Sequence, residues 1–162
     1  MTEIKADNPT SKKASQAAGV PAESPKAVAK SMDKAGFIWG IGRRKTSVAR
    51  VRIRPGEGKL LINGKSLNVY FGREQDRSAV VAALKAVGAE KTFDVFINVN
   101  GGGQTGQAGA ALLGVARALK NYDETFLPAL RDGGYLTRDS RMVERKKPGQ
   151  SGARKRYQFS KR

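Results

Sequence analysis

Apolar and polar residues alternate over residues 48–54, a pattern typical of a β-strand with one buried face. Ala49, Val51 and Ile53 share one side of this strand, and Arg50, Arg52 and Arg54 share the other. The sequence therefore predicts a half-buried strand whose outer face is basic. The turn signal Pro55-Gly56-Glu57-Gly58 follows it.

Two short apolar runs come next, over residues 59–62 and 67–71, with Asn63-Gly64 between them. Asn-Gly is a strong signal for a tight hairpin turn because both residues tolerate positive φ. Together with the strand before them, the two runs predict a small antiparallel meander.

The next pattern changes to helical spacing. Apolar residues over 78–87 form one stripe that stops at Gly88, a typical C-terminal cap residue. Residues 92–100 alternate again, and residues 105–122 return to helical spacing. The order strand, strand, strand, helix, strand, helix predicts an α/β (α+β) two-layer sandwich, with the helices on one face of a mostly antiparallel or mixed sheet.

Composition divides the chain into three parts. Residues 1–35 are rich in Ala, Lys, Ser and Pro and have almost no large apolar side chain, so we expect a disordered extension. Residues 36–137 are long enough for one globular domain. Residues 138–162 form a basic C-terminal tail. An organellar transit peptide is a weaker interpretation of the N-terminal part, which contains four acidic residues and no arginine.

The charge is strongly positive. Thirty-one Lys and Arg against fourteen Asp and Glu give a net charge of +17, typical of a nucleic-acid-binding protein. The chain has no cysteine and no histidine, which excludes disulfides, thiolate chemistry and the commonest metal ligand and general base. An anionic membrane is a weaker candidate partner, because the basic segments have no opposed apolar face. We expect no cofactor, no metal and no small-molecule substrate.

The tail carries the most concentrated charge, with ten basic residues against Asp139 and Glu144. Such a segment repels itself and is most naturally ordered by a polyanion. Tyr157 and Phe159 lie among the cations and could stack on bases or pack on the protein itself. A second basic cluster, Arg43-Arg44-Lys45-Thr46, comes before the first predicted strand.

Gly101-Gly102-Gly103-Gln104-Thr105-Gly106 matches G-x-G-x-x-G between a strand and a helix. A dinucleotide site is disfavoured, because no second strand ending in an acid follows about twenty residues later. Two interpretations stay open. The loop is either a tight turn that needs glycine, or a phosphate site in which backbone amides act with Gln104 and Gln107.

A set of short motifs occurs in one order from about residue 37 to the C-terminus. The motifs are Gly42-Arg43-Arg44-Lys45-Thr46-Ser47-Val48-Ala49-Arg50-Val51, Ile62-Asn63-Gly64, Val99-Asn100-Gly101-Gly102-Gly103, Gly106-Gln107-Ala108, Ala116-Arg117-Ala118-Leu119, Leu136-Thr137-Arg138-Asp139, Glu144-Arg145-Lys146-Lys147 and Gln158-Phe159-Ser160-Lys161-Arg162. In these motifs the chain resembles the bacterial family of small-subunit ribosomal protein nine.

The resemblance implies a fold like the second domain of small-subunit ribosomal protein five, with a left-handed crossover. It implies a structural component of the small subunit, bound to 16S rRNA in the head (the 3′ major domain) beside neighbouring head proteins, in a cytoplasmic ribosome. The tail tip would reach the anticodon stem-loop of P-site tRNA.

The implied contacts fall into two sets. The residues expected at rRNA are Arg43, Arg44, Lys45, Thr46, Gln104, Gln107, Arg138, Arg141, Arg145, Lys146, Lys147, Arg154, Lys155, Arg156, Tyr157 and Phe159. The residues expected at tRNA are Ser160, Lys161 and Arg162. The sequence departs from the family pattern at Leu112-Leu113, where an Arg-His pair is expected, and in the segment from Pro148 to Gly152.

Two rival classes stay open at this point. An RNA-processing or nucleotide enzyme would need clustered carboxylates or a phosphate loop with lysine, and Asp94 is the only suggestively placed acid in the core region. A free RNA chaperone or DNA-binding protein would share the charge without the ordered motifs.

Overall fold

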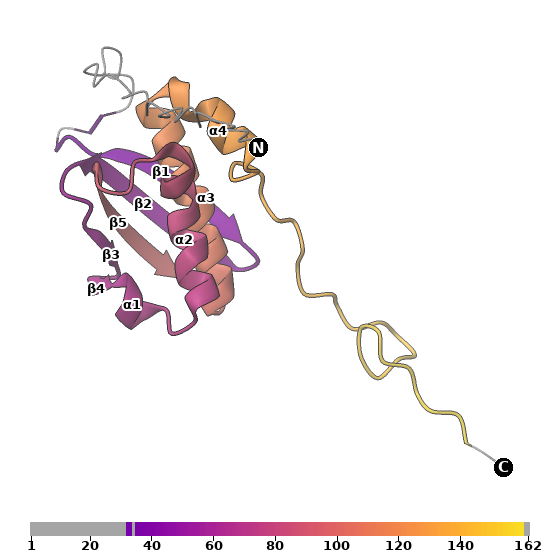
Figure 1. Ribbon diagram of the computed structural model, residues 1–162. Coiled ribbons are helices and arrows are strands. Elements are labelled where there is room, and N and C mark those ends of the chain that lie inside the picture. The colour runs from indigo at the N-terminus through magenta and orange to yellow at the C-terminus, as the bar shows by residue number, and fades with distance from the viewer. Residues whose placement is uncertain (1–31, 34, 161–162) are drawn as a thin grey trace, which may run out of the picture.

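The computed structural model describes residues 32–33 and 35–160. Five strands form one sheet in the order β1-β2-β5-β3-β4 (Figure 1). They span Ile38–Arg44 (β1), Ser47–Pro55 (β2), Leu60–Ile62 (β3), Lys65–Ser66 (β4) and Phe93–Asn100 (β5). Neighbours are antiparallel except β3 and β5, which run parallel, so the sheet is mixed.

The helices are α1 (Leu67–Tyr70), α2 (Glu74–Val87), α3 (Gln104–Tyr122) and α4 (Leu127–Asp132), with a short 3₁₀ turn at Glu124–Phe126. Helices α2 and α3 lie together on one face of the sheet (Figure 1). The predicted two-layer α/β arrangement with helices on one face is confirmed in this coarse form. The hand of the crossover and the likeness to ribosomal protein five stay expectations from the resemblance.

The core lies between the helices and the inner side of the sheet. The inward positions of the central strands are buried: Ala49, Val51 and Ile53 on β2, and the four alternate apolar residues of β5. Helix α2 ends at Gly88, which adopts φ 68° in the left-handed region, as its position after the apolar stripe predicts. Alternation therefore located both central strands correctly.

Strand β1 was missed by the sequence analysis, because two of its inward positions are glycine and give no apolar signal. Gly40 and Gly42 are buried directly beneath α3. A Cβ on Gly40 would lie 2.2 Å from the carbonyl oxygen of Gly114, and one on Gly42 would lie 1.9 Å from that of Ala110. Only glycine allows the strand and helix backbones to approach so closely.

The predicted meander over residues 59–71 is wrong in two respects. Residues Leu67–Tyr70 form a helical turn instead of a strand. In addition, β3 pairs with the later strand β5 in parallel and has no pairing with β2. The Asn63-Gly64 turn itself is correct, since β3 and β4 pair antiparallel on either side of it and both residues have positive φ.

The C-terminal segment leaves the domain after α4 and runs away from it in an extended path (Figure 1). Residues 133–160 contain no helix or strand. Most of the predicted N-terminal extension lies outside the described residues. Within the described part of the chain, no helix is both long and apolar enough to cross a membrane.

Candidate nucleic-acid interface

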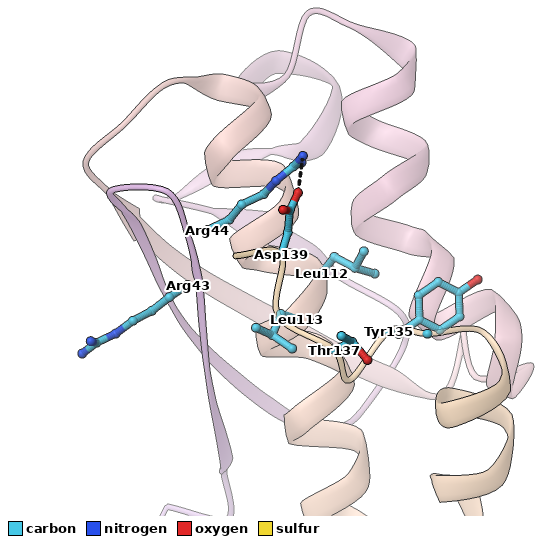
Figure 2. Close-up of a pocket in the computed structure, with 9 residues that line it drawn as sticks. Arg43, Arg44, Leu112, Leu113, Tyr135, Thr137 and Asp139 are labelled. Carbon is cyan, nitrogen blue, oxygen red and sulfur yellow. Dashed lines mark ion pairs between the residues drawn. The ribbon is translucent and has the colours of Figure 1, made fainter. Parts of the chain in front are cut away.

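The β1–β2 hairpin carries the first basic cluster. Lys45 occupies the turn with φ 52°, and Arg43, Lys45 and Thr46 are exposed. Arg43 points away from the domain into solvent, whereas Arg44 turns back over α3 (Figure 2). The cluster therefore presents its cations in two directions.

Arg44 is held inside the protein by two contacts. Its Nη2 lies 3.0 Å from Oδ2 of Asp139, and its Nη1 donates to the carbonyl oxygen of Thr105 at 3.4 Å. The Arg44 and Asp139 side chains are each 25% exposed. This ion pair holds the start of the tail against the hairpin. Only the Arg44 N–H groups that these two contacts leave free could bind RNA.

At the start of the tail, the Asp139 carboxylate also binds a second arginine. Arg141 donates from Nε to Oδ1 of Asp139 at 3.0 Å and from Nη2 to Oδ2 at 2.9 Å. These bonds, with a backbone donor from Arg141 and the charge of Arg44, hold the pKa of Asp139 well below its usual range and raise the pKa of Arg141. Asp139 thus orients two arginines at the junction of domain and tail.

Beside this junction lies a cavity of about 230 Å³ between the hairpin, α3 and residues 134–139 (Figure 2). Leu112 and Leu113 line it together with Tyr135 and Thr137. Leu113 is 3% exposed and Leu112 is partly buried. The departure from the expected Arg-His pair therefore places apolar side chains beneath the start of the tail.

Further along, the tail forms a local loop. Arg154 donates from Nε to both carboxylate oxygens of Glu144 at 3.0 Å, and Ser151 Oγ donates to the carbonyl oxygen of Lys155 at 3.1 Å. The side-chain bond from Arg154 lowers the pKa of Glu144. This loop contains the Pro148 to Gly152 segment, whose residues make room for the turn, with Gly149 at φ 71°.

Six of the eight described tail cations have no carboxylate within ion-pair distance in the part of the chain that the structure describes, and all six are exposed: Arg138, Arg145, Lys146, Lys147, Lys155 and Arg156. Tyr157 is 65% and Phe159 is 91% exposed, so neither ring packs on the protein's own surface. Ser160 is exposed, while Lys161 and Arg162 lie outside the described residues. The tail offers cations and flat rings to solvent, as an RNA-binding segment requires.

The glycine loop packs against the hairpin. Gly101 and Gly102 have φ 72° and 62°, and a Cβ on Gly102 would lie 2.1 Å from Oγ of Ser47. The fully buried Ser47 donates from Oγ to the carbonyl oxygen of Gly101 at 3.1 Å. The loop therefore needs glycine for a tight turn at this place, which is the first of the two interpretations that the sequence left open.

Gln107 belongs to the same turn. Its Nε2 donates to the Gly101 carbonyl oxygen at 3.1 Å, and its Oε1 accepts from the Tyr70 hydroxyl at 2.8 Å. Gln104 is exposed at the start of α3, where no side chain caps the helix. A phosphate contact by Gln104 or by the α3 amides stays a prediction, while the Gln107 amide is already engaged within the protein.

Asp94, the acid considered for metal chemistry, holds a turn together. Its Oδ1 accepts from the backbone amides of Glu57 and Lys59, both at 3.1 Å, and its Oδ2 accepts from Arg54. The Lys59 amide in particular lowers the pKa of Asp94. Within the described residues, no three acidic side chains gather as a metal site would need.

Comparison with known proteins decides the family. The family model described as ribosomal protein S9/S16 matches residues 42–162. The chain belongs to the ribosomal protein S9/S16 family. The small ribosomal subunit protein uS9 of Rhodopirellula baltica is 57% identical over 127 residues, which cover 78% of this chain and 93% of that protein. The resemblance found in the sequence motifs is confirmed.

Membership makes this chain a ribosomal protein, and hence an RNA-binding part of the translation machinery. The structure brings Arg44, Asp139 and Arg141 together, while the remaining tail cations stay spread along an extended path. Sequence reasoning did not foresee the pair between Arg44 and Asp139, because the partners are separated by the whole domain and no local pattern signals their contact.

Proposed function

We propose that the protein is a structural constituent of the small ribosomal subunit that binds 16S rRNA through its basic tail and the β1–β2 hairpin. The observation that carries the proposal is the row of exposed, unpaired cations along residues 138–156, attached to a folded domain of the S9/S16 family. The similar protein from Rhodopirellula baltica is named for the small ribosomal subunit.

The division of labour follows from the chemistry. Lys and Arg along the tail neutralise phosphates and release counterions, which supplies affinity with little sequence discrimination. The domain and the Asp139 junction fix where the tail starts and in which direction it leaves. Folded RNA then selects the protein through the shape of its grooves.

Two finer points extend the proposal. The domain sits in the head of the small subunit, on the 3′ major domain of 16S rRNA beside other head proteins, in the cytoplasmic ribosome. The last residues, Ser160 to Arg162, reach the anticodon stem-loop of P-site tRNA. Support for the tip contact comes from its place after a run of cations that would already be engaged with rRNA, which leaves a short cationic end for a neighbouring phosphate.

Sedimentation tests the proposal against the rival classes. In sucrose gradients at high salt, the tagged full-length protein should co-migrate with small subunits at one copy per particle. Salt weakens each phosphate contact, but many contacts and a complementary shape should keep the protein bound. Recovery mainly at the top of the gradient, with small subunits depleted of the protein, would favour an RNA chaperone or an enzyme that binds only transiently.

A further inference from the structure

In the part of the chain that the structure describes, no helix covers the face of the sheet opposite α2 and α3. Strand register places its outward residues in rows that cross the sheet. One row contains Trp39, Arg52, Phe96 and Leu61, and the next contains Ile41, Arg50 and Asn98. We call the outward residues of β1, β2 and β5 the open face; they are Trp39, Ile41, Arg43, Val48, Arg50, Arg52, Arg54, Asp94, Phe96, Asn98 and Asn100.

The open face is cationic, and all four of its cations are arginine. Its one carboxylate, Asp94, is already engaged by Arg54 and by two turn amides. Arg43 and Arg50 are exposed and have no carboxylate partner in the described part of the chain. This surplus of guanidinium groups matches an anionic partner, and arginine is the cation best suited to phosphate because it donates in a planar fork.

The same face also offers flat groups for stacking. The Arg52 guanidinium lies 5.3 Å from the ring centre of Phe37 and 5.4 Å from that of Phe96, and Arg54 lies 5.4 and 5.5 Å from the same rings. Next to this cluster, Trp39 is 40% exposed and its Nε1 donates to Oδ2 of Asp33 at 2.8 Å. The indole is thus held in place while part of its surface stays accessible.

The open face also exposes apolar side chains and amides. Ile41 is 50% exposed beside Trp39, an uncommon state for large apolar side chains next to each other. Asn98 and Asn100 add exposed amides that can donate to and accept from base edges. Aromatic rings, guanidinium planes and amides on an open sheet are the groups that bind unpaired RNA bases, whereas a protein partner would need a matching acidic surface.

We propose that the open face is a second RNA-binding surface, which receives an unpaired segment of rRNA. A base stacks on Trp39, a second base stacks on the arginine cluster over Phe96, and the phosphates that follow contact Arg50 in the next row and Arg43 in the row beyond it. This inference rests on the proposed function, since it assigns the same RNA to a further surface. The open face lies opposite the helices, whereas the tail leaves from the end of the domain that carries α4 (Figure 1).

Trp39 makes the test direct, because it is the only tryptophan of the chain. Full-length protein is titrated with a transcript of the 3′ major domain of 16S rRNA while tryptophan emission is followed. Stacking of a base on the indole should quench the emission by a large fraction and protect it from acrylamide. The wild-type protein provides this readout without any substitution.

Three variants measure how much Trp39 and Arg50 contribute to the binding free energy. Trp39→Ala should weaken binding about tenfold, and Trp39→Phe should restore most of the loss because a ring is retained. Arg50→Gln should weaken binding several-fold and reduce the salt slope by about 0.7. Lys85→Gln is the matched control, since Lys85 is an exposed cation on α2, on the opposite side of the sheet. Circular dichroism checks that each variant is folded.

The outcomes separate the two proposals. Unchanged Trp39 emission at saturating RNA, with Arg50→Gln equal to Lys85→Gln, would overturn the open-face proposal while the tail account stands. Emission that changes only in assembled small subunits, and never with the bare transcript, would show that a protein covers the face and would equally overturn it. Wild-type protein that fails to bind the transcript at any salt concentration would overturn the proposed function as well.

Discussion

The domain and the tail of this protein keep their shapes by different means. In the domain, 23 hydrophobic residues are buried, and hydrogen bonds join its five strands into one sheet. In residues 138–160 every cation is exposed, two ion pairs form within the tail, and one more joins Asp139 to Arg44 of the hairpin. Apolar burial fixes the domain without any partner, whereas the tail has little besides charge to offer.

This difference separates folding from binding within one short chain. Substitutions in the domain should act first on stability, because they change packing. Substitutions in the tail should act on RNA affinity with almost no change in stability. The small residues at the β1–α3 contact should therefore matter mainly for stability. The unpaired cations of the tail should matter mainly for RNA affinity.

The largest effect is expected from Gly102→Val. Gly102 has φ 62°, and a side chain there would meet Oγ of the buried Ser47, so we expect a loss of roughly 2–4 kcal/mol in the free energy of unfolding. Gly103→Val is the matched control, since no atom lies within 4 Å of its Cβ position and its φ is −115°. Urea denaturation compares the two variants. Equal stabilities would show that the loop is freely deformable.

The same wild-type protein should show no saturable binding of NAD or ATP in calorimetry. The loop is filled by the hairpin and by the amide of Gln107, which leaves no cradle for a nucleotide. Saturable binding would revive the enzyme interpretation.

The next effect is on RNA affinity. Neutralising Arg145, Lys146 and Lys147 together with Gln should leave the urea midpoint unchanged and lower the salt slope of rRNA binding by about 2, at about 0.7 for each phosphate contact. A control that neutralises three exposed cations of the domain, Lys85 on α2, Lys91 in the turn before β5 and Lys120 on α3, should leave most of the slope in place. Filter binding at several salt concentrations measures both. Equal losses would show that charge acts without regard to position.

A smaller effect concerns the turn held by Asp94. Because its pKa in the folded protein is lowered, its contribution to stability is fully present above the unfolded value of 3.8 and is lost as the pH falls below that value toward the folded pKa. Wild-type stability should therefore drop over this acidic range more steeply than that of Asp94→Asn, which lacks the titrating group. Parallel slopes for the two proteins would mean that the carboxylate contributes nothing to the fold.

The smallest effect is expected from deletion of residues 160–162. The deletion removes two of ten tail cations and no core side chain, so folding, rRNA binding and subunit assembly should persist. P-site tRNA should dissociate modestly faster from mutant subunits, because one cationic contact among many is lost. An unchanged dissociation rate in normally assembled subunits would leave the tip without a role at tRNA, and failed assembly would assign it to the rRNA anchor.

Local sequence patterns predicted the parts of the fold that local physics determines. Alternation located β2 and β5, and helical spacing with Gly88 located the end of α2. Strand β1 could not be predicted from local pattern, because Gly40 and Gly42 take the place of apolar residues on its buried side. Glycine is needed there because α3 packs directly against the strand, which is a tertiary contact. The helical turn at Leu67–Tyr70 was read as a strand because a run of four apolar and polar residues is too short to distinguish the two periods.

Part of the candidate site was likewise predictable from sequence, and part was not. Charge density identified the basic tail from sequence, since a cluster of cations is visible without any structure. The ion pair between Arg44 and Asp139 could not be predicted, because it depends on which distant segments meet. The row of Trp39, Arg52 and Phe96 could not be predicted either, because it depends on strand register.

The central claim is that unpaired tail cations bind rRNA phosphates. The most direct test is the salt dependence of binding between the full-length protein and the 3′ major domain of 16S rRNA. Six exposed, unpaired tail cations predict a slope of about −4 in log K against log salt, at roughly −0.7 for each contact. A slope near zero would contradict the account, because affinity would then arise without phosphate neutralisation.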